Sequence, residues 1–321
     1  MKVLVTGSTG FIGLNLVHKL QTTNSFEPLT LVRESSQTEM LPAGVETVYG
    51  DLTQPGSFED GLRRADALIH LAAVYPGYDN DTEQQAENEE GFIREVNVSG
   101  TQLLLERAAD HNIETVVFTS TINAHPDLYD DTVDNQYVIT KYEADQEIVH
   151  GDWPFDWSII HPTYVIGPRD YRLNHFNLFQ RVAANRLLVP PLYIPGQYNI
   201  VHVFDVVDTL RTALNEIGTN RFVVSGENHS ASTLYRTIAA VADDNCFVPP
   251  IPRSVVSIGL SPIVNRLHNR GLYPINGAEF RSGVQRGTVP ERFTNAAPAK
   301  QRSLRTTVKD AYNWYQSVGV L

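Results

Sequence analysis

The sequence predicts an α/β fold built on a doubly wound parallel sheet of the Rossmann type, joined to a smaller, discontinuous C-terminal domain. Short apolar runs alternate with amphipathic helical segments through the first half of the chain, which is typical of a parallel sheet covered by helices on both faces. An apolar strand at residues 3–5 leads directly into three spaced glycines and then into a helix over 11–20. The second half is less regular and rich in proline, which indicates a separate domain.

The three glycines are spaced Gly7-x-x-Gly10-x-x-Gly13. Between a strand and a helix, one glycine permits the tight turn and the next lets backbone N–H groups approach a pyrophosphate, while the third lets the helix pack on the sheet. The phosphates then meet the positive end of the helix dipole. This order of elements predicts a dinucleotide-binding domain at the start of the chain.

The later elements continue the alternation. Strands are expected at 29–32, 45–49, 67–73, 116–118 and 157–160, and helices at 57–64, 93–110 and 138–149. Further on, 201–204 and 222–224 read as core strands, so the chain is expected to leave the sheet and return to it. The predicted dinucleotide-binding domain is 1–166 with a returning segment at about 200–225, and the predicted substrate domain is 167–199 with 226–321.

Composition excludes several classes of protein. A hydrophobic share of 42% with 19% charged residues is typical of a soluble globular chain. A net charge of −12 argues against nucleic acid or an anionic membrane as partner. Cys246 is the single cysteine and the histidines are scattered, so neither an intramolecular disulfide nor a metal site is expected. With no signal peptide and no apolar run near the roughly 20 residues of a membrane helix, we expect a cytoplasmic protein.

Two polar residues follow the second and third predicted strands. Arg33 occupies the position at which an acidic residue would bind the ribose 2′-hydroxyl of NAD. Its planar, charged guanidinium favours the 2′-phosphate of NADP instead. The charge of the neighbouring Glu34 would oppose that phosphate. Asp51 closes the third strand, where its carboxylate can accept a hydrogen bond from the adenine amino group or simply form a turn.

The residues that carry chemistry come next. Tyr137 and Lys141 are spaced i, i+4 on a predicted helix, which places the phenol and the ammonium on one face. A nearby ammonium stabilises a phenolate and is expected to lower the pKa of the tyrosine toward the working range of general acid–base catalysis. A hydroxyl from Thr121 or Ser120, one strand upstream, can hold a substrate carbonyl.

Two further residues and two segments keep alternative interpretations open. Asn97 fits either a helix kink with a proton-relay water or the satisfaction of buried backbone groups, and Asp205 fits a helix N-cap better than a catalytic role. The apolar stretch 252–267 fits a helical wall over the site or an ordinary surface helix, and the acidic run 79–90 fits a solvated loop.

With these residues in place, the chain resembles the extended short-chain dehydrogenase/reductase family, also called the NAD(P)-dependent epimerase/dehydratase family, over essentially its whole length. Its dihydroflavonol-reductase-like branch is the most similar. The motifs that carry the resemblance are Gly7/Gly10/Gly13, Gly50-Asp51-Leu52, His70-Leu71-Ala72-Ala73, Asn97-x-x-Gly100-Thr101, Thr119-Ser120-Thr121, Tyr137-x-x-x-Lys141, His161-Pro162-Thr163 with Gly167-Pro168, and Val201-His202-Val203-x-Asp205-Val206.

The resemblance implies a catalytic triad of Thr121, Tyr137 and Lys141, in which Lys141 also holds the nicotinamide ribose. It implies that the segment 162–165 borders the nicotinamide and that the protein forms a homodimer. The cofactor-binding residues expected on these grounds are Gly7, Thr9, Gly10, Phe11, Ile12, Gly13, Arg33, Asp51, Leu52, Leu71, Ala72, Ala73, Thr119, Tyr137, Lys141, Pro162 and Val165.

Three functions are compatible with these residues. The first is an NADP-dependent oxidoreductase, with NAD as the other cofactor, that reduces a ketone or aldehyde by hydride transfer or oxidises the alcohol. The second is a nucleotide-sugar epimerase or dehydratase with tightly held NAD(P). In such enzymes an arginine usually precedes the segment at Val201-His202, whereas this chain has Gln197-Tyr198-Asn199-Ile200. The third is a catalytically silent nucleotide-binding sensor, in which the triad would have no catalytic role.

Overall fold

The computed structural model describes residues 1–75, 89–173, 179, 197–242, 266, 270, 289–298 and 301–321. The acidic loop and the apolar stretch 252–267 fall almost wholly outside the described residues. The chain divides into two compact units. The first comprises Met1–Pro162, Phe204–Val224 and Ala297–Ala299, and the second comprises Thr163–Val203, Ser225–Ala296 and Lys300–Leu321.

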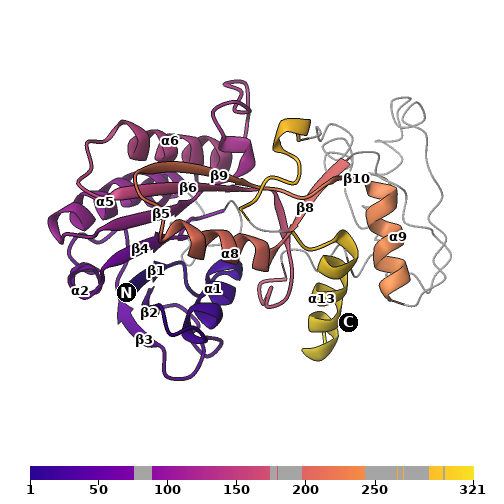
Figure 1. Cartoon of the computed structure of the whole chain (residues 1–321), viewed down its shortest axis with the longest axis horizontal. Coiled ribbons are helices and arrows are strands. Elements are labelled where there is room, and N and C mark those ends of the chain that lie inside the picture. The colour runs from indigo at the N-terminus through magenta and orange to yellow at the C-terminus, as the bar shows by residue number, and fades with distance from the viewer. Residues whose placement is uncertain are drawn as a thin grey trace. The chain divides into compact units, whose positions relative to one another are not determined.

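The first unit is built on a seven-stranded sheet in which every neighbouring pair of strands is parallel (Figure 1). The strands are β1 (Lys2–Thr6), β2 (Glu27–Val32), β3 (Glu46–Tyr49), β4 (Ala67–His70), β5 (Thr115–Thr119), β6 (Asp156–Pro162) and β9 (Thr219–Val224). Their order is β3-β2-β1-β4-β5-β6-β9, so the direction of winding reverses between β1 and β4. This is the predicted doubly wound fold, and ligands bind at the carboxyl ends of the strands beside such a reversal.

Helices cover both faces of this sheet (Figure 1). In the part of this unit that the structure describes, they are α1 (Phe11–Gln21), α2 (Glu59–Arg63), α4 (Glu89–Arg94), the π-helical turn η1 (Glu95–Ser99), α5 (Gly100–Asp110), the 3₁₀ turn η2 (Ile122–Ala124), α6 (Gln136–His150) and α8 (Val203–Ala213). In Figure 1, α1 and α8 lie on one side of the sheet, and α2, α5 and α6 lie on the other. The single helix predicted over 93–110 is thus interrupted by a π turn.

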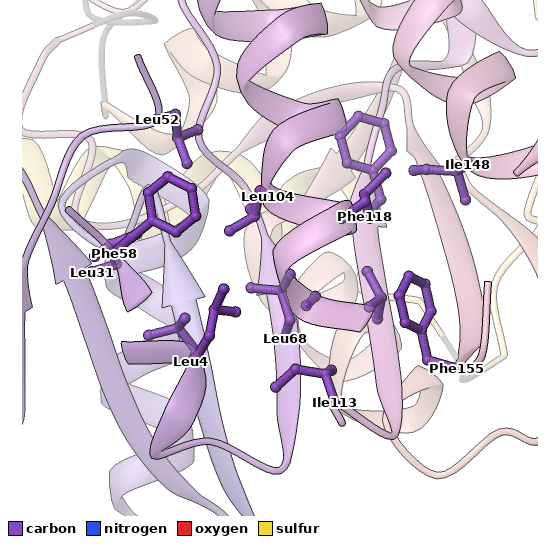
Figure 2. Close-up of a cluster of buried hydrophobic side chains, with 14 of the residues drawn as sticks. Leu4, Leu31, Leu52, Phe58, Leu68, Leu104, Ile113, Phe118, Ile148 and Phe155 are labelled. Carbon is purple, nitrogen blue, oxygen red and sulfur yellow. The ribbon is translucent and has the colours of Figure 1, made fainter. Parts of the chain in front are cut away.

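One hydrophobic core joins the sheet to α2, α5 and α6. Figure 2 shows Leu4, Leu68 and Phe118 of the sheet together with Leu104 of α5 and Ile148 of α6. All five side chains are almost completely buried. Burial of each such side chain contributes roughly 1.5–3 kcal/mol, so this core accounts for the position of α6 against the sheet.

The second unit has its own sheet and core. Its three strands are β7 (Tyr164–Ile166), β8 (Gln197–His202) and β10 (Asn228–Ser230), with β8 parallel to β7 and antiparallel to β10. Among its described residues, the helices are α9 (Ala231–Val241), the 3₁₀ turn η3 (Glu291–Phe293) and α13 (Leu304–Ser317). Apolar side chains of α9 and α13, with Ile166 and Ile200 of the strands, form one buried cluster.

The prediction that 201–204 form a strand of the main sheet is wrong. The strand there ends at His202 and pairs with β7 and β10 in the second unit, and α8 begins at Val203. The expected N-cap role of Asp205 is wrong as well, because Asp205 lies inside the first turn of α8. The physical reason is the helical spacing of the buried apolar side chains Val203, Val206, Val207 and Leu210.

Candidate active site

The glycine turn has the geometry that a dinucleotide cradle requires. Gly7 has a φ of +65°, and a Cβ there would lie 2.7 Å from the backbone nitrogen of Ala72. A Cβ on Gly13 would lie 2.1 Å from the carbonyl oxygen of Gly7, so this glycine lets α1 pack on the turn itself. Gly10 is the N-cap residue of α1 and bonds through its N–H to the Gly7 carbonyl. Ser8 in the turn is buried, and its hydroxyl has no partner among the described residues.

His70 fixes the end of β4 beside this turn. The hydroxyl of Thr6 accepts the N–H groups of Leu71 and Ala72, so its single proton is donated to Nδ1 of His70 at 2.7 Å. Thr101 Oγ1 donates to the carbonyl of Asn97, so it accepts from His70 Nε2 at 2.9 Å. Burial lowers the pKa of His70 to about 3, which keeps the ring neutral. His70 therefore has a structural position in which both ring nitrogens are used.

Arg33 and Asp51 occupy the ends of β2 and β3. Arg33 opens a turn in which its N–H bonds to Ser36 Oγ and its carbonyl accepts the N–H of Ser36. Asp51 Oδ1 accepts from both the N–H and the hydroxyl of Thr53, so one carboxylate oxygen serves a local turn. Leu52 beside it is buried in the core of the first unit.

Asn97 links the end of β4 to α6. It lies in η1, where its Oδ1 accepts the N–H of Val74 at 2.7 Å and its Nδ2 donates to the Val74 carbonyl at 3.0 Å. The same Nδ2 donates to Thr140 Oγ1 at 3.1 Å. Of the two interpretations of Asn97, the structure shows the satisfaction of buried backbone groups, combined with an interruption of the helix. These bonds hold the first half of α6 against the segment that follows β4.

Tyr137 lies near the start of α6, one residue into the helix. The Asn135 side chain caps α6 by accepting the N–H of Val138. The Tyr137 ring packs against Tyr75, which follows β4, with 5.0 Å between ring centroids. Burial raises the pKa of Tyr137 to about 12, and the negative charge of Asp145 acts in the same direction. The predicted lowering of this pKa by Lys141 is therefore not found in the protein alone, because burial disfavours the phenolate.

Lys141 lies one turn further along α6 and is only 2% exposed. Its Nζ sits 3.9 Å from the centroid of the Phe118 ring, in a cation–π contact from β5. Burial lowers the pKa of Lys141, while the charge of Asp145 opposes that shift. Tyr137 and Lys141 thus share the helix face that looks onto the ends of β4 and β5.

The hydroxyls that end β5 have different surroundings. Ser120 is 3% exposed and faces Asp145 of α6, whereas Thr121 is partly exposed. The carbonyl of Thr121 accepts from Nδ1 of His161 at 3.1 Å, which fixes the backbone there. Thr119 is buried, and its hydroxyl has no partner among the described residues. Thr121 is therefore the more accessible of the two hydroxyls predicted to hold a carbonyl.

The sheet brings most of the predicted residues to one edge. The glycine turn follows β1, Arg33 follows β2, Leu71–Ala73 follow β4, Thr119 ends β5 and Pro162 ends β6. These five strands are parallel and adjacent in the order β2-β1-β4-β5-β6, so their carboxyl ends lie along the same edge. Thr9 lies in the turn, Phe11 and Ile12 begin α1, and Val165 belongs to β7 of the second unit.

Two buried residues near Lys141 escaped the sequence reasoning as site residues. Asp145 of α6 is fully buried, and its Oδ2 lies 3.6 Å from Nε2 of His161, which is also fully buried. The spacing of Asp145, four residues after Lys141, was the signal that could have identified it. In the part of the chain that the structure describes, no group of three or more His, Cys, Asp or Glu could hold a metal ion, and no helix there is long and apolar enough to span a bilayer.

Known proteins share this sequence pattern over most of their length. Sterol demethylase protein B of Methylococcus capsulatus is 24% identical over 350 residues, which cover 100% of both chains. UDP-glucose 4-epimerase of Vibrio cholerae is 27% identical over 285 residues, covering 83% of this chain and 84% of the relative. A putative dihydroflavonol 4-reductase of Synechocystis is 26% identical over 345 residues, covering 98% and 94%.

Solved structures share the fold. UDP-glucose 4-epimerase of Thermotoga maritima, solved with UDP-glucose, superposes with a TM-score of 0.70 at 17% identity, covering 99% of both chains. The enzyme WbmH of Bordetella bronchiseptica, solved with NAD⁺, has a TM-score of 0.70 at 18% identity, also covering 99% of both chains.

The model of the NAD dependent epimerase/dehydratase family matches residues 3–225. This match spans more than half of the chain and includes the glycine turn, Tyr137 and Lys141. The chain therefore belongs to the NAD-dependent epimerase/dehydratase family, as its motifs predicted, and is an NAD(P)-dependent enzyme of the short-chain dehydrogenase/reductase kind.

Proposed function

We propose that this protein is an NADP-dependent oxidoreductase that reduces a ketone or aldehyde to the alcohol, or catalyses the reverse reaction. One observation carries the proposal: Tyr137 lies on α6 against the segment that follows β4, in the same unit as the glycine turn, and its phenol is held protonated by a pKa of about 12. A protonated phenol is the form that can give a proton to a carbonyl oxygen.

The residues at the edge of the sheet fit a dinucleotide. A Cβ on Gly7 or Gly13 would fill the space along the turn, and the hydroxyls of Ser8 and Thr119 are buried there without partners among the described residues. The residues that would hold the cofactor are those of the turn, Arg33, the segment after β4 and Lys141. When bound, such a cofactor supplies or accepts a hydride at its nicotinamide ring.

Each residue of the triad has a distinct role in the proposal. Tyr137 donates its proton to the oxygen of the substrate carbonyl. Thr121, partly exposed at the end of β5, orients that oxygen by a hydrogen bond. Lys141 holds the ribose and, as an ammonium on the same helix face, favours the phenolate that remains after the proton has left.

The preference for NADP rests on Arg33. Its backbone is fixed in a turn with Ser36 directly after β2, which is where the fold places the ribose of the adenosine. A guanidinium there can pair with a 2′-phosphate through two parallel hydrogen bonds. Glu34, the neighbouring carboxylate, is exposed, so it can remain in water while Arg33 binds.

A second candidate, a nucleotide-sugar epimerase with tightly held NAD(P), is favoured by the relative in Vibrio cholerae, whose name is UDP-glucose 4-epimerase. Strand β8 argues against it. Residues 197–200 of the strand include no basic side chain for a diphosphate, and Asn199 bonds to the backbone of Gly226 through both side-chain groups. The reductase therefore remains the proposal.

The test is a cofactor-depletion screen on the full-length protein. Absorbance of added NADPH, and separately of NADH, is followed over diverse ketones and aldehydes with the wild type and with Tyr137→Phe. We expect consumption of NADPH in preference to NADH, and a loss of at least about 100-fold in kcat for Tyr137→Phe, as is typical when a general acid is removed. The affinity for NADPH should stay nearly unchanged, since the phenylalanine keeps the ring contact with Tyr75.

Three outcomes would contradict the proposal. Turnover retained by Tyr137→Phe would remove the proton donor. Protein purified with stoichiometric oxidised cofactor, together with interconversion of UDP-sugars and no net consumption of NADPH, would favour the epimerase. Binding of NADPH without turnover of any carbonyl or sugar nucleotide would favour the silent sensor.

A further inference from the structure

Helix α6 carries a third ionisable residue on the face that holds Tyr137 and Lys141. Asp145 follows Lys141 by four residues, so the three side chains succeed one another along the helix at one turn each. Lys141 is 2% exposed and Asp145 is 0% exposed. A buried carboxylate and a buried ammonium one turn apart require an electrostatic explanation, because each is costly to bury alone.

The surroundings of Lys141 supply little charge of their own. Its Nζ contacts the face of Phe118, and the pKa of the nearby His70 is lowered to about 3, so that ring is neutral. Burial lowers the pKa of Lys141, and the attraction of Asp145 is the opposing cause. Among the described residues, Asp145 is thus the carboxylate that favours the ammonium form.

The ring beside the Asp145 carboxylate is that of His161, which is neutral. Nδ1 of His161 is 3.1 Å from the carbonyl oxygen of Thr121, which can only accept, so Nδ1 carries the proton of the neutral ring. Nε2 of His161 then presents a lone pair to Asp145 Oδ2 at 3.6 Å. His161 stays neutral because burial lowers its pKa to about 3, with His125 contributing from the edge of its ring.

Groups on three elements favour the charged form of Asp145. Burial raises the pKa of this carboxyl, and the Ser120 hydroxyl at the end of β5, Lys141 on α6 and Arg221 on β9 oppose the shift in that order. Arg221 is exposed, so water screens it. Asp145 also raises the pKa of Tyr137, which helps to keep the phenol protonated.

We propose that Asp145 is a positioning residue of the active site, the buried counter-ion that keeps Lys141 an ammonium in surroundings that would otherwise neutralise it. The inference rests on the proposed function, in which Lys141 acts in its charged form. It assigns Asp145 a role through Lys141 and not through contact with substrate. Lys141 and Asp145 each favour the charged form of the other, against the burial that disfavours both charges.

The test reads the protonation of Lys141 directly, without cofactor or substrate. The sequence has five lysines, so protein labelled with ¹³C at the lysine ε-carbon gives a simple NMR spectrum. Lys141→Arg removes one signal and thereby identifies it. We expect Asp145→Asn, which keeps the shape of the side chain and loses the charge, to lower the titration midpoint of Lys141 by at least about one pH unit. The other lysine signals are internal controls and should not move.

Activity provides a second readout. In Asp145→Asn, the alkaline limb of the pH profile of kcat/KM should move to lower pH by a similar amount, with a loss of about 10-fold or more near pH 8 and a smaller loss near pH 6. Asp145→Glu, which keeps the carboxylate, should restore most of both readouts. A merely structural role would lower activity at all pH values without moving the limb.

An unchanged Lys141 midpoint in folded Asp145→Asn would overturn the inference. If that variant does not fold, Ser120→Ala decides, since it removes one hydroxyl that favours the Asp145 charge. A smaller drop in the Lys141 midpoint supports the inference, and no drop overturns it. Failure of the proposed function is distinguishable: there Tyr137→Phe would retain turnover, whatever the NMR titration of Lys141 shows.

Discussion

The side-chain nitrogen of Asn97 lies 3.1 Å from the hydroxyl oxygen of Thr140, and this hydrogen bond joins the π-helical turn η1 to helix α6. The same amide group pairs with the N–H and the C=O of Val74, just after β4. A single buried side chain therefore connects the end of a central strand with the helix that carries Tyr137 and Lys141.

Replacement of Asn97 by alanine should destabilise the protein. The variant leaves the buried N–H and C=O of Val74 without their partner, and each unsatisfied buried group costs about 1–3 kcal/mol. We expect the free energy of unfolding, measured by urea denaturation followed by circular dichroism, to fall by about 2 kcal/mol or more. Asn123→Ala at an exposed position is the matched control and should change it by less than about 0.5 kcal/mol. Equal stability of the two variants would contradict the linking role of Asn97.

Substitution of Gly13 by alanine should weaken both cofactor binding and folding. The new Cβ would lie 2.1 Å from the Gly7 carbonyl oxygen, which is backbone and can move only if the turn moves. We expect the affinity for NADPH, measured by fluorescence titration, to fall by about 10-fold or more, with a loss of roughly 1–3 kcal/mol in stability from overpacking.

The control for that variant is Gly61→Ala in the same unit. A Cβ on Gly61 would meet the side-chain ends of Leu4 at 3.1 Å, and these flexible atoms can shift. Gly61 belongs to α2 and not to the turn, so this variant should bind NADPH like the wild type. If Gly13→Ala also binds like the wild type, the turn does not hold the cofactor.

His70 should make the stability of the protein depend on pH below about 6.5. Its folded pKa is about 3, against an ordinary value of 6.5, so the unfolded chain takes up the proton first as the pH falls. Neutral His70 makes its full contribution to the free energy of unfolding above pH 6.5, and this contribution is lost progressively between pH 6.5 and about pH 3. Between pH 7 and pH 5, this one group should account for a loss of about 2 kcal/mol.

The measurement compares urea unfolding of the wild type and of His70→Asn at these two pH values. The difference between pH 7 and pH 5 should shrink by about 2 kcal/mol in the variant, which has lost the titrating group. His150→Asn, at an exposed position of α6, should leave the difference as it is in the wild type. An identical pH dependence in His70→Asn and the wild type would show that His70 is not held neutral.

Much of the first unit could be predicted from sequence because its signals are local. The strand before Gly7, the helix after Gly13 and the i, i+4 spacing of Tyr137 and Lys141 each depend on residues close together in the chain. The prediction of a main-sheet strand over 201–204 failed because it, too, used only local signals. Its apolar residues fit both a strand and the start of α8, and only pairing with β7 and β10 distinguishes the two.

The sequence by itself determined the class of fold, the glycine turn and the spacing of Tyr137 and Lys141 on one helix, because backbone conformation and helix periodicity depend on neighbouring residues. Only the tertiary structure decided how deeply those groups are buried. The pKa of Tyr137 rises where the helix spacing predicted a fall, and Lys141 and Asp145 are both buried, because desolvation depends on how residues distant in sequence exclude water.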